Sequence, residues 1–333
     1  MKQQENLSNT LDLKVLLLNA ENLFLLFDQK PPTEVQNLDE NQWQKLSTSV
    51  YENKPLYKLL ELKKMIETEQ PDIMMFCEVG GAESLSNFNH FFLNHQYSTA
   101  LIEGNSDRHI DVGFLISKKL SLYFDLQSNK NRPLQFNYDS EGPSLKFSRD
   151  AAELRLFSTD KEKPFLIFLL THLKSHLDPE KKDPQGNRRR TAELKTLMEI
   201  YLELEKSFPQ VPIVVAGDFN GNASKNATDP EFIDLYQKTQ LEDVLELAQV
   251  KPELRWTFYQ VRTGGGRQDG KQLDYVFLNP LLKSHLKTET CRVLRYKDEY
   301  GFDLDWPMTL EAKLRLPSDH YPLLFELEKI KIW

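Results

Sequence analysis

The stretch VPIVVAGDFNG, from Val211 to Gly221, places a short apolar run directly before a glycine, an acid and an asparagine. The run Ile213 to Ala216 is rich in β-branched residues, which is typical of a buried strand. Asp218 and Asn220 would then stand where this strand ends. A carboxylate beside an amide at such a position could hold and deprotonate a water molecule.

Strand-like runs recur along the whole chain, and amphipathic segments lie between them. Besides Val211 to Ala216, the strand-like runs are Lys14 to Leu18, Asp72 to Phe76, Asp111 to Ile116, Phe165 to Leu170, Leu273 to Leu278 and Tyr321 to Leu327. Helical spacing of apolar residues appears twice, in the sets Leu59, Leu62, Ile66 and Leu194, Leu197, Met198, Tyr201, Leu202. Without a long linker between these elements, we expect a polar tail over residues 1–11 and a single α/β domain over 12–333.

Composition is that of an ordinary globular protein. The 333 residues are 40% hydrophobic and 28% charged, and the net charge of −8 argues against a broadly basic nucleic-acid coat without excluding a nuclease. No run approaches the roughly 18 apolar residues of a membrane span, and MKQQENLSNTLDLK has no apolar signal core. Cys77 and Cys291 lie far apart, which indicates neither a disulfide framework nor a thiolate metal site. We therefore expect a soluble, cytoplasmic monomer.

Polar residues able to do chemistry follow one strand-like run after another. Besides Asp218 and Asn220, they are Asn19, Glu78, His172, Asp274, Asp319 and His320. Mg²⁺ prefers oxygen ligands, and Asn19, Glu78 and Asp319 are suitable donors. The two histidines suit contacts to a phosphate or a leaving group. The pattern indicates a hydrolytic site around a hard cation, with Asp218 as the candidate base.

Eight short motifs occur in the order that characterises a known superfamily. They are NAENLF, FCEVGG, DRHIDVGFLIS, FSRDAAELRL, THLKSH, VVAGDFNG, QLDYVF and SDHYPL. In these motifs the chain resembles the endonuclease/exonuclease/phosphatase superfamily over residues ~13 to 328, and most closely the bacterial proteins of that general label. The resemblance implies a deoxyribonuclease-like fold, a four-layer α/β sandwich in which two packed mixed β-sheets are flanked by helices.

The resemblance also implies a role for each strand-end residue. Asn19 and Glu78 would be metal-site residues, and Asp319 would complete the site. Asp218 would orient or deprotonate the attacking water, and Asn220 would position the scissile phosphate. The implied cofactor is Mg²⁺, with Mn²⁺ as a possible substitute.

Two histidines would lie against the phosphate, each oriented by a carboxylate. The resemblance implies that Asp274 orients His320. For His172 it implies Asp111 as the partner, although a carboxylate between Ile110 and Val112 could also lie on the solvent face of a strand.

Two arginines are secondary candidates for contacts to substrate phosphate. Arg149 matches an arginine that contacts nucleic-acid phosphate in the deoxyribonuclease branch. Arg188 belongs to the run Arg188 to Arg190, which opens the second amphipathic segment, where phosphates are often received. A solvated start of the helix is the preferred interpretation of that run.

The substrate is the open part of the interpretation. We expect a Mg²⁺-dependent phosphodiesterase, an endonuclease or exonuclease that hydrolyses DNA or RNA. One alternative is a phosphatase or phospholipase C-type enzyme acting on inositol phosphates or sphingomyelin. That enzyme would need an apolar membrane-facing loop, for which Trp306 is the best aromatic candidate. The other is a non-catalytic module that binds phosphate ligands, which would have lost a central residue; none is missing.

Overall fold

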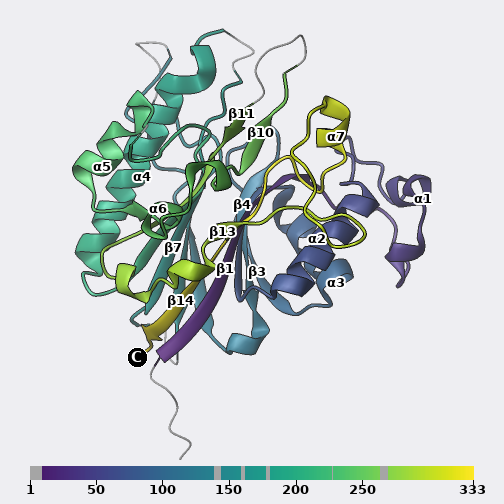
Figure 1. The fold of residues 1–333 in the computed structure, drawn as a ribbon, viewed down its shortest axis with the longest axis horizontal. Coiled ribbons are helices and arrows are strands. Elements are labelled where there is room, and N and C mark those ends of the chain that lie inside the picture. The colour runs from purple at the N-terminus through teal and green to yellow at the C-terminus, as the bar shows by residue number, and fades with distance from the viewer. Residues whose placement is uncertain (1–9, 139–143, 159–161, 178–180, 227, 263–268) are drawn as a thin grey trace, which may run out of the picture.

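Two six-stranded sheets form the centre of the computed structural model (Figure 1). The structure describes residues 10–138, 144–158, 162–177, 181–226, 228–262 and 269–333. Of the expected N-terminal tail, residues 1–9 lie outside this part, and the first strand already begins at Thr10.

The first sheet has the order β13-β14-β1-β2-β4-β3, so the first and last strands of the chain lie side by side. Its strands are β1 (Thr10–Leu23), β2 (Ile73–Val79), β3 (Tyr97–Ala100), β4 (Asp111–Ser117), β13 (Arg292–Val293) and β14 (Leu323–Lys331). β1 is parallel to β2 and antiparallel to β14. The sheet is therefore mixed.

The second sheet has the order β5-β6-β7-β8-β12-β9 and is also mixed, because β7 and β8 are parallel whereas β8 and β12 are antiparallel. Its strands are β5 (Tyr123–Ser128), β6 (Ala151–Phe157), β7 (Leu166–His172), β8 (Ile213–Asp218), β9 (Glu242–Asp243) and β12 (Asp274–Leu278). A separate hairpin pairs β10 (Phe258–Gln260) with β11 (Asp269–Lys271).

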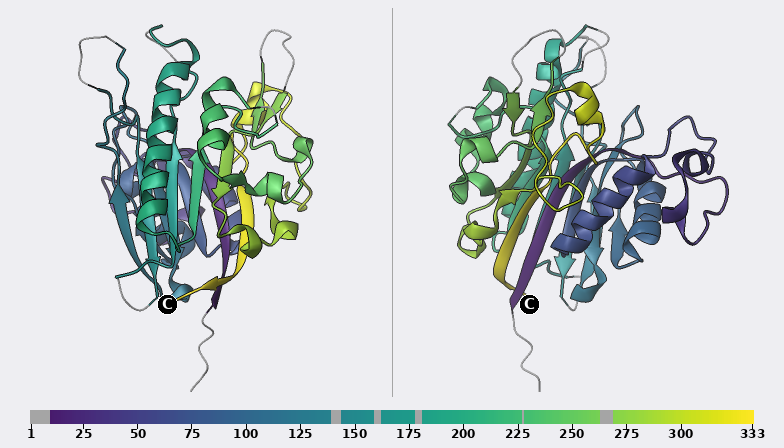
Figure 2. Two further views of the ribbon diagram at one scale, coloured as in Figure 1. Left: turned by 90° about the vertical axis from the view of Figure 1, so that its left-hand side faces the viewer. Right: turned by 45° about the vertical axis from the view of Figure 1, so that its right-hand side comes forward.

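Helices cover the outer faces of both sheets (Figures 1 and 2). The first sheet carries α2 (Leu56–Glu69) and α3 (Gly81–Leu93), with α1 (Glu40–Gln44) beyond them. The second carries α4 (Asn187–Ser207) and α5 (Ile233–Lys238). The short helices α6 (Val244–Leu247) and α7 (Leu310–Leu314) lie in connecting segments. The expected four-layer sandwich is confirmed. Within the described ranges, no helix has both the length and the apolar character that crossing a membrane requires.

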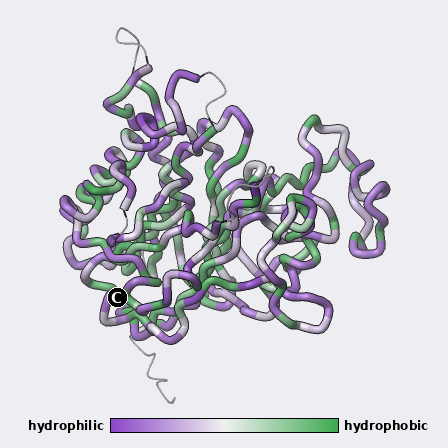
Figure 3. Tube along the Cα trace, turned by 45° about the horizontal axis from the view of Figure 1, so that its top comes forward, coloured by the Kyte–Doolittle hydropathy of each residue, from purple (hydrophilic) through white to green (hydrophobic). Residues whose placement is uncertain are grey.

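The alternation of side chains along β1 shows why the layers form. Val15 and Leu17 belong to the core between the two sheets, whereas Leu16 and Leu18 belong to the core under α2 and α3. Successive side chains of a strand point to opposite faces, so a continuous apolar run fills both cores. Figure 3 shows hydrophobic and hydrophilic residues interspersed along most of the trace, as amphipathic elements require.

The apolar stripe of α4 is nearly as expected. Leu194, Leu197, Met198 and Tyr201 are buried in the core between the helix and the second sheet. Leu202 is 39% exposed instead. Eight residues of an α-helix turn the side chain roughly 80° past that of Leu194, which places it at the edge of the buried stripe.

Candidate active site

Three expected site residues lie side by side across the second sheet. In the strand register, Asp218 at the end of β8 pairs with His172 of β7 on one side and with Asp274 of β12 on the other. A Cβ atom on Gly217 would lie only 1.8 Å from the carbonyl oxygen of Thr171, and the φ of Gly217 is +144°. Glycine is therefore required for β7 and β8 to approach as they do, because any side chain would push them apart.

Asp218 lies at the centre of the cluster and joins the two sheets. Its Oδ2 accepts a hydrogen bond of 2.9 Å from Nδ2 of Asn19 on β1, and its Oδ1 accepts one of 2.8 Å from the backbone N–H of Asn220. Burial, and then the neighbouring charge of Asp274, raises the pKa of Asp218 to about 7. Its carboxyl group can therefore exchange a proton close to neutral pH.

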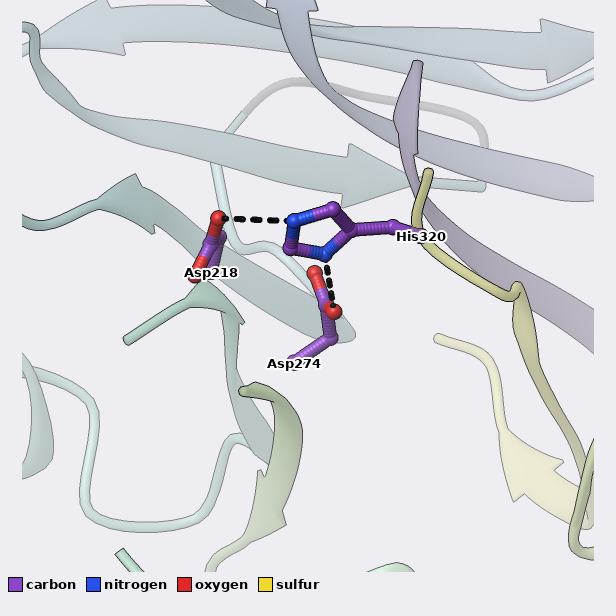
Figure 4. A group of neighbouring side chains, drawn as sticks. All are labelled: Asp218, Asp274 and His320. Atoms are coloured by element: carbon purple, nitrogen blue, oxygen red, sulfur yellow. Dashed lines mark hydrogen bonds and ion pairs between the residues drawn. The ribbon is translucent and has the colours of Figure 1, made fainter. Parts of the chain in front are cut away.

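His320 is fixed between two carboxylates (Figure 4). Its Nδ1 lies 2.7 Å from Oδ2 of Asp274, and its Nε2 lies 3.9 Å from Oδ2 of Asp218. Burial disfavours the charged imidazolium, but Asp274 and then Asp218 outweigh this effect and raise the pKa of His320 to about 10. His320 is therefore a fixed cation, and the expected pairing with Asp274 is present.

His172 is fully buried and faces different partners from those expected. Its Nε2 lies 3.6 Å from Oδ2 of Asp218 and 4.0 Å from Oε1 of Glu78. Burial, followed by the positive charge of Arg149, holds the pKa of His172 well below its usual range, so the imidazole is neutral. Among the described residues its Nδ1 has no hydrogen-bond partner.

The expected bond from Asp111 to His172 is not formed. Oδ1 of Asp111 instead accepts a hydrogen bond of 2.7 Å from the backbone N–H of Gly104. Asp111 is buried at the start of β4, so it does not lie on a solvent-exposed strand face either. The carboxylate therefore holds the loop that precedes β4.

The irregular end of β2 orients the side chain of Glu78. The register of β2 against β4 shifts between Phe76 and Val79, and Glu78 has a φ of +61°. Its Oε2 accepts a hydrogen bond of 3.2 Å from the backbone N–H of Asn22, which also has a positive φ, of +54°. Bulges and left-handed residues of this kind commonly redirect side chains at functional sites.

Asp319 is not one of the residues that meet around Asp218, although its charge, after those of Asp274 and Asp218, acts against burial to raise the pKa of His320. Asp319 is partly exposed, and its Oδ2 lies 3.4 Å from Nζ of Lys313 in α7. Neither Lys313 nor Asn22, the support of Glu78, was expected at the site. For Asn22 a signal was present, because it stands in NAENLF beside Asn19. Lys313 had none, since it lies in a surface helix that no strand pattern marks.

The two candidate arginines differ in position. Arg149 is buried, and burial lowers its pKa while the charges of Glu193, Glu78 and Asp218 oppose the shift, which indicates that it lies near the cluster. Arg188 is exposed, and its guanidinium stacks 5.1 Å from the ring centroid of Phe136. Within the described ranges, no hydrogen bond or ion pair joins its side chain to the cluster.

The carboxylates of the cluster can face a hard divalent cation. Asp218, Asp274 and His320 offer ligand atoms within 4.8 Å of one another, and a buried oxygen of Asp274, Oδ1, has no hydrogen-bond partner in the described part of the chain. Nδ1 of His320 is already bonded to Asp274, which leaves mainly carboxylate oxygens to face a cation. Mutual repulsion between buried carboxylates is relieved when a cation binds near them.

Comparisons with known proteins agree with the fold. The model of the endonuclease/exonuclease/phosphatase family matches residues 14–248. No curated protein matches the chain. Among solved structures, the human nocturnin catalytic domain with bound sulfate is similar at a TM-score of 0.57 and 15% identity, over 95% of this chain and 93% of that one.

Two further structures are similar over nearly their full lengths. TDP2 of D. rerio in complex with a single-strand DNA product has a TM-score of 0.56 at 14% identity, with 95% of this chain and 98% of that one covered. An endonuclease/exonuclease/phosphatase family protein of Bacteroides thetaiotaomicron has a TM-score of 0.54 at 16% identity, with 96% and 98% covered. At these identities the likeness shows a shared fold.

Proposed function

The chain belongs to the endonuclease/exonuclease/phosphatase family and is a metal-dependent phosphoric ester hydrolase; from this premise we propose that it cleaves the phosphodiesters of nucleic acids with Mg²⁺. The observation that carries the proposal is the placement of Asp218 between Asn19, His172 and His320 at the ends of strands from both sheets. Membership of this family favours an enzyme over the non-catalytic module.

We propose that Asn19, Glu78 and Asp319 hold the cation. The group of Asp218, Asp274 and His320 is less suited to this role, because His320 is itself a cation bonded to Asp274 and Asp218 already accepts two hydrogen bonds. When bound, Mg²⁺ neutralises charge on the substrate phosphate and on the attacking oxygen. The fixed orientation of Glu78, through its bond from Asn22, supports this role. Nζ of Lys313 lies 3.4 Å from Oδ2 of Asp319, so a cation bound by this carboxylate would have a positive charge beside it.

Asp218 orients the attacking water and accepts its proton. A carboxyl group with a pKa near the working pH is well suited to general base catalysis, and that of Asp218 is raised to about 7. Nδ2 of Asn19 and the backbone N–H of Asn220 hold the two oxygens of this carboxylate in one orientation. Asn220 is also our candidate for positioning the scissile phosphate.

The two histidines have different roles near the substrate phosphate. His320 is a cation oriented by Asp274, so it stabilises negative charge that develops on the phosphate. The imidazole of His172 is neutral, so one ring nitrogen can donate a hydrogen bond and the other can accept one near the phosphate. The buried guanidinium of Arg149 supplies further positive charge toward phosphate, whereas a role for Arg188 stays a prediction.

A phospholipid head group is the second candidate substrate, because two exposed apolar side chains favour it. Trp306, the aromatic residue expected to face a membrane, is half-buried and stacks on Tyr259, with ring centroids 5.3 Å apart. On the same segment, however, Phe302 is 71% exposed and Met308 is 62% exposed. Exposed apolar side chains of this kind could enter the interface of a lipid surface.

A substrate panel tests the proposal. Purified protein with Mg²⁺ or Mn²⁺ should hydrolyse single-stranded or double-stranded DNA, or RNA, and this activity should weaken steeply with salt. EDTA and Asp218→Asn should abolish it, while Asp234→Asn, an exposed acid in α5, should leave it unchanged. Activity confined to sphingomyelin vesicles would select the lipid alternative, and equal rates for Asp218→Asn and the wild type would refute the mechanism.

The expectations of a monomer and of a cytoplasmic location stay proposals. Size-exclusion chromatography and cell fractionation test them.

A further inference from the structure

A cavity of about 610 Å³ opens beside the end of β1, outside the cluster around Asp218. Its walls come from the turn after β1, from the segment that leads into α2 and from the loop before β4. The residues that matter for its chemistry are Asn22, Phe24, Tyr51, Lys54, Lys58 and Arg108. Its size falls within the range of pockets that hold small ligands.

Two hydrogen bonds connect this cavity to the proposed metal site. Nη2 of Arg108 donates to Oδ1 of Asn22 at 2.8 Å. The backbone N–H of Asn22 in turn donates to Oε2 of Glu78 at 3.2 Å. A substrate whose scissile phosphate lies at Glu78 would therefore extend directly into the cavity.

One wall of the cavity is an aromatic surface. The rings of Phe24 and Tyr51 stack with their centroids 4.8 Å apart and their planes 11° apart, and His109 meets Tyr51 edge-on at 5.3 Å. A Cβ atom on Gly80 would lie 2.2 Å from the ring of Phe24, so glycine allows this ring to occupy its place. Tyr51 lines both this cavity and a neighbouring one of about 380 Å³.

The inner wall carries positive charge. Nζ of Lys54 and Nζ of Lys58 lie 3.3 and 2.9 Å from the same oxygen of Glu21, and both lysines are buried. Two ammonium groups therefore share one carboxylate. Glu52 and Asp107 also line the cavity, but they are exposed at its rim, where solvent screens their charges.

We propose that this cavity is a subsite for the nucleotide unit next to the scissile phosphate, with its base stacked on Tyr51 and its phosphate bound by Arg108. The proposal rests on the proposed nuclease function and names the substrate unit that the site selects. Aromatic side chains stack on any base, and guanidinium groups bind phosphate through two N–H donors. A lipid head group offers a phosphate without a planar ring and would leave Tyr51 unused.

Two oligonucleotides of equal length test the subsite, one with normal bases and one with base-less tetrahydrofuran residues. The wild-type enzyme should have a KM about tenfold or more lower for the oligonucleotide with bases, because stacking contributes on the order of 1–3 kcal/mol per base. Tyr51→Ala should remove this preference, and Tyr51→Phe should keep it. Arg108→Ala should raise the KM for both oligonucleotides and reduce the salt dependence of binding.

The control is Tyr123→Ala, which removes an exposed tyrosine from the edge strand β5 and should change neither KM. Fluorescence anisotropy in EDTA gives the same comparison as dissociation constants, without turnover. Equal KM values of the wild type for the two oligonucleotides, or a preference that survives in Tyr51→Ala, would overturn the subsite alone. A wild-type enzyme that cleaves neither oligonucleotide would refute the nuclease function and the subsite with it.

Discussion

Asp243→Asn should stabilise the protein, and the gain should depend on pH. Asp243 is fully buried on β9, next to β12, and Oδ2 accepts a hydrogen bond of 3.1 Å from Nε2 of Gln272. Its Oδ1 and Oε1 of Gln272 are buried without a hydrogen-bond partner among the described residues. An amide at position 243 could accept the bond from Gln272, and it would carry no charge.

The magnitude follows from the pKa of Asp243, which burial raises from 3.8 to about 7. Below pH ~4 both the folded and the unfolded chain are protonated at this residue, so the charge has no effect. As the pH rises to about 7, only the unfolded chain ionises, and the wild type loses about 1.4 kcal/mol of stability per pH unit. Asp243→Asn avoids this loss and should be more stable by roughly 2–4 kcal/mol at pH 8.

Urea unfolding of the wild type and of Asp243→Asn at pH 4.5 and pH 8 measures this difference. The two free energies of unfolding should differ by about 1 kcal/mol at pH 4.5, and the difference should grow to roughly 2–4 kcal/mol at pH 8. Asp234→Asn is the control, because it removes an acid from an exposed position and should show no such dependence. An Asp243→Asn protein that is less stable than the wild type at pH 8 would refute the reasoning.

Two other substitutions test the strand ends. Asp274→Asn should lower kcat by roughly 10²-fold or more, because His320 loses its orienting charge, whereas KM should change little; an unchanged kcat in steady-state kinetics would contradict that role. Gly217→Ala should lower the free energy of unfolding by about 3 kcal/mol or more, because its Cβ would meet the Thr171 carbonyl at 1.8 Å. Gly301→Ala is the matched control in urea unfolding, since Gly301 has a φ of +88° but no atom within 4 Å of its Cβ position; equal losses would contradict the steric argument.

The sequence predicted the central strands well, because each is a short apolar run and each ends in a polar residue. Asp218, His172 and Asp274 come together because adjacent strands share a register, which follows from β7, β8 and β12 being neighbours. The pairing of His320 with Asp274 was predicted from the resemblance to the family instead, and the distance of 2.7 Å agrees with it. The strands β9 and β13 were missed, since two residues carry no periodicity. The longer strands β5 and β6 were also absent from the expected strands; both contain charged or polar residues that interrupt an apolar run.

Loop geometry could not be predicted. Asp111 holds the N–H of Gly104, and no pattern in the sequence shows that a backbone donor will lie there. The stack of Phe24 on Tyr51 joins residues 27 positions apart through an irregular segment. Lys313 likewise reaches Asp319 from a helix of one or two turns. Such contacts depend on how loops pack, and hydrophobic periodicity carries no information about them.

The central claim is that a divalent cation held at Glu78 enables hydrolysis of a phosphodiester. The most direct test is the initial rate of DNA cleavage as a function of Mn²⁺ concentration, for the wild type, Glu78→Gln and the exposed control Glu83→Gln. The wild type and Glu83→Gln should follow the same curve, and Glu78→Gln should need more than about tenfold more Mn²⁺ for half-maximal rate. Cleavage by the wild type in EDTA, or a Glu78→Gln curve that coincides with the wild type, would contradict the claim.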